Sequence, residues 1–450
     1  MAHPLDQLSS RFSGQLVQPN DAAFEELRRV HNGLVDRYPA LIARCRSTQD
    51  VADVVKFAGG AGLEIAVRGG GHNVAGRATC DRGVVIDLSL MRGVVVDAGS
   101  SLARVQGGAT WRDFNAATET HHLASTGGVV SSTGVAGLTL GGGLGWLMGV
   151  CGLAVDNVRS IQVVTANGHV VNTSAVEAPD LFWAMRGGGG NFGVATSFEF
   201  ALHPIGPRVT GGLIAHPFAA ARDVLRHYRD VTADAPDALT AFAGLVHSPD
   251  GVAKLAAFVA CHCGPLAVAE RETQSLKTYG QPVMDAFGPL DYAQLNTMLD
   301  DGYPRGALNY WKSSFMAGLT DEAIDTMVDC YARCPSPMSQ LLLEHFHGAA
   351  TRVPVSETAC PHRTPGYNFL VLCQWSQPAD TLRCVQWARD TYQAMRPFMA
   401  ATRYVNYLND DEDGDPAVAA YGPNYQRLRA IKTRYDPMNV FHLNQNIPPA

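Results

Sequence analysis

One stretch of this chain holds ten glycines within 33 residues, from Ser125 to Asn157 (STGGVVSSTGVAGLTLGGGLGWLMGVCGLAVDN), and carries almost no charge. Glycine buries no side chain and costs backbone entropy on folding, so plain packing does not explain such a run. Glycine does allow the backbone to approach another group closely, and successive backbone N–H groups can hold phosphate oxygens. The stretch therefore indicates a surface where the backbone meets a flat or anionic group.

A second glycine-rich turn lies upstream, at residues 68–73 (RGGGHN). It carries one nucleophilic side chain, His72, and the longer run carries another, Cys151, near its end. Taken alone, a histidine in a glycine turn is an ordinary loop residue and a lone cysteine is an ordinary core residue. Two glycine-rich loops with one nucleophile each indicate a large cofactor that is held at two points.

A third motif, Gly188-x-Gly190-x-x-Gly193, matches the dinucleotide fingerprint of Rossmann folds. That fingerprint follows a strand and opens a helix, whereas Val194 begins a β-strand pattern in this chain. We therefore expect no Rossmann nicotinamide site.

The bulk composition excludes several classes of protein. A length of 450 residues predicts two domains. A formal net charge of −7 and a pI near 6.1 give no basic field for nucleic acid. The first residues show no secretory signal, and no apolar run reaches the roughly 20 residues that span a bilayer. We expect a cytoplasmic protein without nucleic-acid or membrane partners, and the sequence leaves the oligomeric state open.

The ten cysteines are too few for a disulfide framework, so most are expected to be buried thiols. Cys261-His262-Cys263 and the pair Cys330 and Cys334 lack the CxxC spacing that structural zinc sites use. We therefore expect no metal site.

Hydrophobic periodicity predicts two halves that differ in the length of their helices and strands. The first half has short elements: helices at 21–31, 48–58, 110–120 and 179–185, strands at 63–67, 84–88, 94–96 and 194–202, and a hairpin over 160–173 that turns at Asn167-Gly168. After Pro204 and Pro207, longer strands (239–246, 252–263, 369–375) alternate with helices (219–232, 265–279, 321–333, 379–395), followed by a last helix near 424–434. This alternation indicates an α+β fold in which helices cover one face of an antiparallel sheet.

At these residues the chain resembles the flavoprotein oxidases of the vanillyl-alcohol-oxidase (PCMH) type, in the berberine-bridge-enzyme-like branch. The matching segments are RGGGHN at 68–73, VCGLAVDN at 150–157 and the tail YGPNYQRLRAIKTRYDPMNVFHLNQNI at 421–447. The resemblance implies a PCMH-type FAD-binding domain at 1–205 and an antiparallel-sheet substrate domain at 206–410. It also implies that a C-terminal segment, 411–450, returns to the FAD domain.

The resemblance further implies that the cofactor is FAD and that it is attached twice. His72 matches the histidine that bonds to the flavin 8α-methyl, and Cys151 matches the cysteine that bonds to C6 in bicovalent members. The pyrophosphate is expected on backbone N–H groups of Ser131–Gly134, Gly141–Gly143 and loop 69–73. The remaining residues expected to contact FAD are Arg68, Gly69, Gly70, Gly71, Asn73, Gly127, Val130, Thr133, Gly137, Leu138, Gly145, Trp146, Gly152, Asp156, Asn157, Gly190, Asn191, Gly193, Val194, Asn444 and Asn446.

Oxidation of an alcohol carbon needs a base for the O–H proton. The segment 404–407 (YVNY) reads as a strand and matches the family's N-Y motif, and alternation would place Tyr404 and Tyr407 on opposite faces. We expect Tyr407 to be the base, with Tyr404 in reserve. The third candidate is Gln374, at a strand position where relatives carry glutamine or a catalytic glutamate. Because an ordinary tyrosine pKa is about 10, the site must stabilise phenolate or share its proton.

Four further residues are expected to line the substrate pocket: Tyr310, Trp311, Lys312 and Trp375. The alternative for the two tryptophans is core packing. The expected function is that of an FAD-dependent oxidase, which moves hydride from a CH–OH or CH–NH carbon of a sugar or natural-product-like molecule to flavin N5 and reduces O2 to H2O2. Two alternatives are a dehydrogenase with another electron acceptor, and a non-catalytic flavin- or ligand-binding protein in which the tyrosines are structural.

Overall fold

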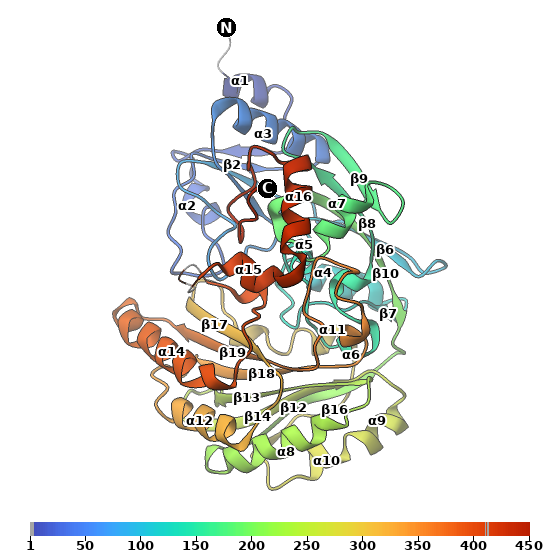
Figure 1. Cartoon of the computed structure of the whole chain (residues 1–450), viewed down its shortest axis with the longest axis vertical. Helices are drawn as coiled ribbons and strands as arrows, with labels where there is room; N and C mark the ends of the chain where they lie inside the picture. The colour runs from blue at the N-terminus through green and yellow to red at the C-terminus, as the bar shows by residue number, and fades with distance from the viewer. Residues whose placement is uncertain (1–3, 410, 412–413) are drawn as a thin grey trace.

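The computed structural model describes residues 4–409, 411 and 414–450. In Figure 1 the upper half of the molecule is coloured mainly blue to green, and the lower half yellow-green to orange. The first sheet of the upper half has the order β1-β2-β4-β3. Its strands are β1 (Gln15–Val17), β2 (Leu41–Arg44), β4 (Val84–Asp87) and β3 (Ile65–Arg68). Strands β2 and β3 both run parallel to β4, and the crossover helix α3 (Thr48–Ala61) packs against them.

Helix α3 begins where its flanking residues predict. The Ser47 hydroxyl accepts the Asp50 N–H at 3.1 Å, and the Asp50 carboxylate accepts the Ser47 N–H at 3.1 Å, which forms a capping box. The predicted end at residue 58 is wrong, because the helix continues through Ala61. The left-handed residue that ends it is Gly62, with φ 64°.

The second sheet of the upper half is antiparallel, with the order β5-β6-β10-β8-β9. Its strands are β5 (Val94–Asp97), β6 (Leu102–Gln106), β10 (Val194–Ala201), β8 (Val158–Val164) and β9 (Val170–Ser174). The β8–β9 hairpin turns at Asn167-Gly168, as predicted, and Gly168 takes φ 71°. Helices α4 (Trp111–Glu119) and α7 (Pro179–Met185) contribute to one hydrophobic core with this sheet.

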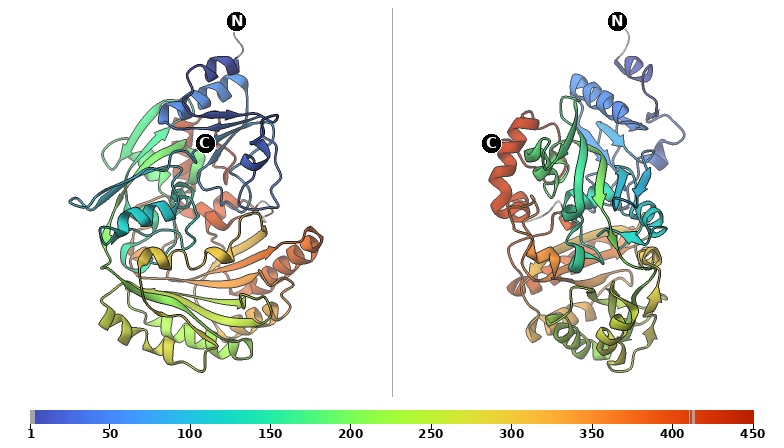
Figure 2. Two further views of the ribbon diagram at one scale, coloured as in Figure 1. Left: turned by 180° about the vertical axis from the view of Figure 1, so that it is seen from behind. Right: turned by 90° about the vertical axis from the view of Figure 1, so that its right-hand side faces the viewer.

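One long antiparallel sheet forms the lower half, with the order β15-β12-β14-β13-β18-β19-β17 and with β16 beside β12. Its strands are β12 (Val209–Pro217), β13 (Leu239–His247), β14 (Lys254–His262), β15 (Met284–Asp285), β16 (Gly288–Leu290), β17 (Leu308–Met316), β18 (Gln340–Phe346) and β19 (Gly366–Trp375). Helices α8 (Ala221–Ala233), α12 (Asp321–Ala332) and α14 (Thr381–Met395) cover its outer face (Figures 1 and 2). The predicted α+β class, with helices on one face of an antiparallel sheet, is confirmed.

Several predicted elements differ from the structure. The helix expected over 265–279 divides into α9 (Leu266–Glu272) and α10 (Gln274–Thr278), because Thr273 leaves helical geometry with φ −100° and ψ 0°. The helix expected over 21–31 shortens to α2 (Phe24–Leu27), because the following residues turn toward loop 69–73. Strands β12, β17 and β18 were not predicted.

The C-terminal segment packs on the upper half, where α16 (Tyr425–Tyr435) lies beside α7 (Figure 1). It follows α15 (Pro416–Tyr421), and Arg434 pairs with Asp180 of α7 at 2.7 Å. The domain boundaries near residues 205 and 410 stay a prediction. Among the described residues, no helix is long and apolar enough to cross a membrane, and no group of three or more His, Cys, Asp or Glu side chains could hold a metal ion.

Candidate active site

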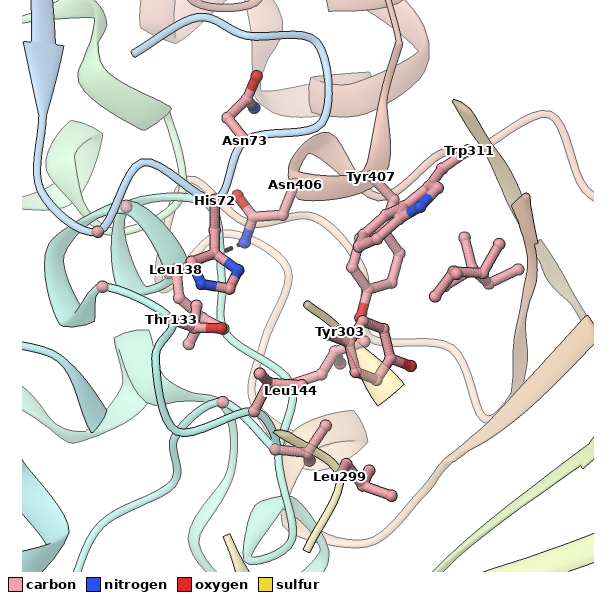
Figure 3. Close-up of a pocket in the computed structure, with 18 of the residues that line it drawn as sticks. His72, Asn73, Thr133, Leu138, Leu144, Leu299, Tyr303, Trp311, Asn406 and Tyr407 are labelled. Atoms are coloured by element: carbon pink, nitrogen blue, oxygen red, sulfur yellow. Dashed lines mark hydrogen bonds between the residues drawn. The ribbon is translucent and has the colours of Figure 1, made fainter. Parts of the chain in front are cut away.

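A cavity of about 730 Å³ separates the loops of the upper half from the long sheet. One wall consists of loop 69–73, the glycine run from 128 to 144, and the segments 189–193 and 444–445. The facing wall is the sheet face that α8, α12 and α14 leave uncovered. In Figure 3, His72 and Thr133 lie on the first wall, and Tyr303, Trp311 and Tyr407 lie across from them.

Loop 69–73 follows directly from β3, and Arg68 fixes its position. The Arg68 guanidinium donates to Asp87 Oδ2 at 2.8 Å and to the Leu27 carbonyl at 2.6 Å. Gly71 takes φ 69°, a conformation that favours glycine. Within the described part of the chain, the backbone N–H groups of 69–73 donate to no protein acceptor. A row of such N–H groups in a turn makes a concave anion site, which supports the expected pyrophosphate contact at this loop.

In the long glycine run, most of the N–H groups that were expected at the pyrophosphate have partners within the protein. The Ser131 N–H donates to the Asp300 carboxylate at 2.8 Å. The N–H groups of Gly141–Gly143 donate to carbonyl oxygens of the same run and, for the last of them, to the Tyr404 hydroxyl at 2.9 Å. The N–H groups of Ser132 and Gly134 donate to no acceptor in the described part of the chain, so the expected pyrophosphate contact stays a prediction at these two positions.

The glycines of the run also allow close backbone packing. A Cβ on Gly134 would lie 2.4 Å from the backbone nitrogen of Gly70, so the two glycine loops touch directly. A Cβ on Gly127 would lie 2.2 Å from the Trp111 ring, and one on Gly145 would lie 1.9 Å from the Gly127 carbonyl oxygen. Ordinary side chains would therefore separate the loops that form this wall.

The predicted FAD contacts divide into two groups. The cavity is lined by Gly69, Gly70, Gly71, His72, Asn73, Val130, Thr133, Gly134, Gly137, Leu138, Gly141, Gly190, Gly193 and Asn444. The structure places the others behind the wall: Arg68, Gly127, Ser131, Gly142, Gly143, Gly145, Trp146, Cys151, Gly152, Asp156, Asn157, Asn191, Val194 and Asn446. Members of this second group support the loops, since Trp146 stacks on Phe242 at 4.8 Å and Asp156 pairs with Arg363 at 2.8 Å.

His72 projects into the cavity from its loop (Figure 3). Its Nε2 lies 2.9 Å from Ser132 Oγ, and its ring stacks on His31 with centroids 4.0 Å apart. Burial, together with the nearby His31 and Arg305, lowers the pKa of His72 to about 3. The imidazole is therefore neutral at physiological pH and carries a lone pair, as a nucleophile requires.

Cys151 does not share the cavity with His72. It ends the short helix α6 (Met148–Cys151) and packs in a hydrophobic cluster that includes Cys263. Burial raises the pKa of its thiol to about 12, so the thiol is not a poised thiolate. The expected second attachment, from Cys151 to flavin C6, therefore finds no geometric support.

Asn191 ties the C-terminal segment to the cavity wall. Its Nδ2 donates to the Gln445 carbonyl at 3.1 Å, and its Oδ1 accepts the Ile447 N–H at 3.2 Å. Lys432 Nζ donates to the Asn191 carbonyl at 2.6 Å and pairs with Asp436 at 2.6 Å, with both charged side chains fully buried. These bonds place Asn444 and Gln445 at the edge of the cavity.

Tyr404 precedes a 3-10 turn, Val405–Tyr407, and Tyr407 ends it, so the strand predicted there is wrong. The Tyr404 hydroxyl accepts the N–H groups of Gly143 and Leu144 at 2.9 and 3.3 Å, and these tertiary bonds override the local strand preference. The two tyrosine rings meet edge to face at 4.9 Å, and both line the cavity. The expected strand alternation therefore does not place Tyr404 and Tyr407 on opposite faces.

The sequence analysis missed one residue of this wall, Glu344 on β18. Its carboxylate accepts the Tyr407 hydroxyl at 3.0 Å and the Asn368 Nδ2 at 2.6 Å. Burial raises the Glu344 pKa to about 7, and burial together with the adjacent carboxylate raises the Tyr407 pKa well above its ordinary value. A carboxyl that titrates near neutral pH is suited to take a proton, so the geometry favours Glu344 over Tyr407 as base.

Of the four residues predicted to line the substrate pocket, Trp311 does so. Tyr310 and Lys312 alternate with it on β17 and point away, where both bond to Asp411, with Lys312 Nζ 2.9 Å from Oδ1. Trp375 is buried in the core beneath the helices, which is the alternative the sequence left open.

Gln374 lines the cavity beside Trp311, as predicted for a site residue. Its Nε2 donates to Asn309 Oδ1 at 3.2 Å, whereas its buried Oε1 has no partner among the described residues. That oxygen can accept a hydrogen bond from a ligand, but an amide does not act as a base at neutral pH.

Comparisons with known proteins agree with this geometry. The family model "FAD binding domain" matches residues 39–174, and "Berberine and berberine like" matches 403–448. The chain is 32% identical to (R)-6-hydroxynicotine oxidase of Paenarthrobacter nicotinovorans over 97% of each chain. The crystal structure of 6-hydroxy-D-nicotine oxidase from Arthrobacter nicotinovorans superposes with a TM-score of 0.90 at 30% identity, covering 98% of each chain. The berberine-bridge-like protein 1 of Physcomitrella patens, at 22% identity and a TM-score of 0.89 over 99% of each chain, shares the fold.

The residues that line the cavity fit FAD. Loop 69–73 offers unpaired N–H groups for a pyrophosphate. A Cβ at Gly137 would meet no atom within 4 Å, so this glycine leaves open space on the wall for a flat group. His72, with its neutral imidazole, projects from this loop into the cavity, which its side chain lines together with Tyr407 and Trp311.

Proposed function

This chain belongs to the berberine-bridge-enzyme-like family of FAD-dependent oxidoreductases, and we propose that it is an oxidase of a small cationic amine. In this reaction the carbon beside the amine nitrogen loses a hydride, and the substrate becomes an imine. FAD, when bound, accepts the hydride at N5 and supplies two electrons to O2, which gives H2O2.

The charge of the substrate wall carries this proposal. Among the described residues that line the lower half of the cavity, Glu344 and Asp301 carry acidic side chains, and none is a lysine or arginine. The Tyr407 hydroxyl donates to the Glu344 carboxylate, and the Tyr407 ring packs edge to face against the Trp311 ring at 5.7 Å. A carboxylate next to aromatic rings favours a cation through charge pairing and cation–π attraction. The 32%-identical relative is named for an amine, 6-hydroxynicotine, which agrees with this preference.

The same residues can perform the proton step. An ammonium must lose a proton before the adjacent carbon can release hydride, because the nitrogen lone pair stabilises the cation that forms. Glu344, with a pKa of about 7, can accept that proton at neutral pH. Tyr407 and Asn368 donate to the two carboxylate oxygens and so orient the group. The apolar strand residues around them exclude water, which strengthens these interactions.

We further propose that FAD is attached through His72 alone. A neutral imidazole inside the cavity supports this bond, and the position of Cys151 in the cluster with Cys263 gives no support to a second one. After acid precipitation the wild-type protein should stay yellow, with an intact mass raised by one FAD. His72→Ala should release its flavin on acid, and Cys151→Ala should retain it. Acid-stable flavin in His72→Ala would restore the second attachment.

Anaerobic mixing tests the substrate class. Both enantiomers of 6-hydroxynicotine and a panel of matched pairs, in which a hydroxyl replaces the amine nitrogen, would be followed by the loss of flavin absorbance. We expect the amines to reduce the flavin and so remove its absorbance, and the matched alcohols to leave the absorbance unchanged. Bleaching by neutral alcohols alone would overturn the amine assignment, and no bleaching by either class would favour a non-catalytic ligand-binding protein.

Admission of air after bleaching separates an oxidase from a dehydrogenase. We expect rapid return of the flavin absorbance, with one H2O2 released per substrate oxidised. Slow return in air, together with fast reoxidation by a quinone, would assign the chain to the dehydrogenase alternative.

A further inference from the structure

Two side chains that the sequence analysis gave no role hold the His72 imidazole on two sides. Ser132 Oγ lies 2.9 Å from Nε2. The His31 ring lies against the His72 ring, with centroids 4.0 Å apart and planes 21° from parallel. Neither side chain lines the cavity, so neither has an evident role in substrate binding.

Backbone bonds fix His31 in this position. Its N–H donates to the Gly71 carbonyl at 3.0 Å, and its own carbonyl accepts the Gly306 N–H at 2.9 Å. The next residue, Asn32, donates from Nδ2 to the Val74 carbonyl at 2.7 Å. The segment that carries His31 is thus bonded to residues on either side of His72, at Gly71 and at Val74. Hydrogen bonds between the two segments therefore hold the two stacked rings together.

The two contacts determine what the imidazole can do. When Nε2–H donates to the Ser132 hydroxyl, the proton is held on Nε2 and the lone pair lies on Nδ1. Stacking on His31 limits rotation of the ring and keeps water from one of its faces. An imidazole that is neutral, fixed and in a single tautomer is prepared for attack by Nδ1.

We propose that Ser132 and His31 are positioning residues for the covalent attachment of FAD to His72. Ser132 selects the tautomer in which Nδ1 attacks, and His31 holds the ring in the attacking orientation. In this step Nδ1 bonds to the 8α carbon, one C–H bond of that methyl group breaks, and the imidazole loses its Nε2 proton through the Ser132 hydroxyl. The two electrons of the broken bond and the two protons pass to the isoalloxazine and then to O2, which becomes H2O2. The inference rests on the proposed attachment at His72.

The test follows the rate of attachment in the full-length chain. Protein purified from riboflavin-starved cells would be mixed with FAD, and samples would be quenched in acid at intervals to measure acid-stable flavin by intact mass. Ser132→Ala should slow the covalent step roughly fivefold or more, as expected for loss of one hydrogen bond. His31→Ala should slow it roughly three- to tenfold, as expected for loss of an aromatic pair. Ser132→Thr keeps the hydroxyl and His31→Phe keeps the stacked face, so both should load at close to the wild-type rate.

Two readouts separate positioning from a general structural effect. The dissociation constant for FAD before attachment, measured by flavin fluorescence, and the melting temperature should both stay near wild type in all four variants. A matched control is His227→Ala, because His227 also stacks on an aromatic ring, Tyr279 at 3.9 Å, but lies on α8 and does not contact His72. It should load at the wild-type rate.

Each outcome bears on a different proposal. Attachment at the wild-type rate in both Ser132→Ala and His31→Ala would overturn the positioning inference and leave the attachment at His72 intact. Weakened FAD binding with an unchanged covalent rate would also overturn it. Release of all flavin by the wild-type protein on acid would instead overturn the proposed attachment itself.

Discussion

Tyr407→Phe distinguishes two bases that lie within hydrogen-bonding distance of each other. The substitution removes the hydroxyl that donates to Glu344 at 3.0 Å and keeps the ring that packs against Trp311 and Tyr404. Folding and flavin content should therefore be preserved. If Glu344 is the base, the loss of this donor acts on the reaction through the Glu344 pKa.

The size of the effect follows from the hydrogen bond that is lost. A hydrogen bond to a charged group contributes about 1.5–3 kcal/mol, and about 1.36 kcal/mol corresponds to one pKa unit. Loss of the Tyr407 donor should therefore raise the Glu344 pKa from about 7 to roughly 8–9. At pH 7 the ionised fraction falls from about one half to roughly 1–10%, which slows flavin reduction by about 5- to 50-fold. The rate should recover above pH 9, where the carboxyl is ionised in both proteins.

The assay is anaerobic stopped-flow reduction of the flavin between pH 6 and 10. The wild-type rate should fall tenfold per pH unit below pH 7, because the protonated carboxyl cannot accept a proton. Glu344→Gln should be slower by roughly 10² to 10⁴ at every pH and should lose this dependence. A loss of that size in Tyr407→Phe that persists at pH 10 would refute the reasoning and return the role of base to Tyr407.

Three further predictions concern the cavity wall and its supports. Gly134→Ala should abolish FAD loading, because its Cβ would lie 2.4 Å from the backbone of the facing loop. The control Gly60→Ala, whose Cβ would meet no atom within 4 Å, should load normally, and equal flavin content in the two variants would contradict the loop contact. Asp436→Asn leaves the Lys432 ammonium buried without its counter-ion and should cost about 3–5 kcal/mol of unfolding free energy, seen as a lower urea midpoint; an unchanged midpoint would exclude a charged buried pair. The rate of covalent attachment at pH 5 should stay within about twofold of that at pH 8, since the pKa of His72 is about 3; an ordinary histidine would lose about thirtyfold, and such a loss would contradict the neutral imidazole.

The features that the sequence predicted correctly depend on neighbouring residues. The Asn167-Gly168 turn and the Ser47 capping box are decided within a few positions, and both are present. The resemblance in the 68–73 loop likewise led to the correct family, because the loop and its flanking strand form one local unit. The end of α3 was predicted wrongly. The glycine that takes the left-handed conformation is Gly62 and not Gly59 or Gly60, and this choice depends on packing.

The parts of the site that sequence missed depend on contacts across the chain. The Tyr404 hydroxyl bonds to the glycine run 261 residues away, and this bond, not strand propensity, shapes the turn that carries Tyr407. Glu344 lies in LLLEHF, and the single carboxylate in an apolar run was a usable signal of a buried acid. Cys151 was assigned from the resemblance of segment 150–157 to the family, and the packing of the short helix α6 in the cluster with Cys263 could not be inferred from that segment alone.

The bond between Asn191 and Gln445 spans 254 residues of chain and has a consequence for synthesis on the ribosome. The loops that carry His72 and Gly134 emerge early, but Lys432 and Ile447, which bond to Asn191, lie 241 and 256 positions after it and emerge much later. The nascent chain therefore exposes its cofactor loops for most of its synthesis without the segment that completes their wall. A message truncated ahead of Lys432 therefore yields a polypeptide that retains the FAD-binding sequence but lacks the last part of the cavity wall.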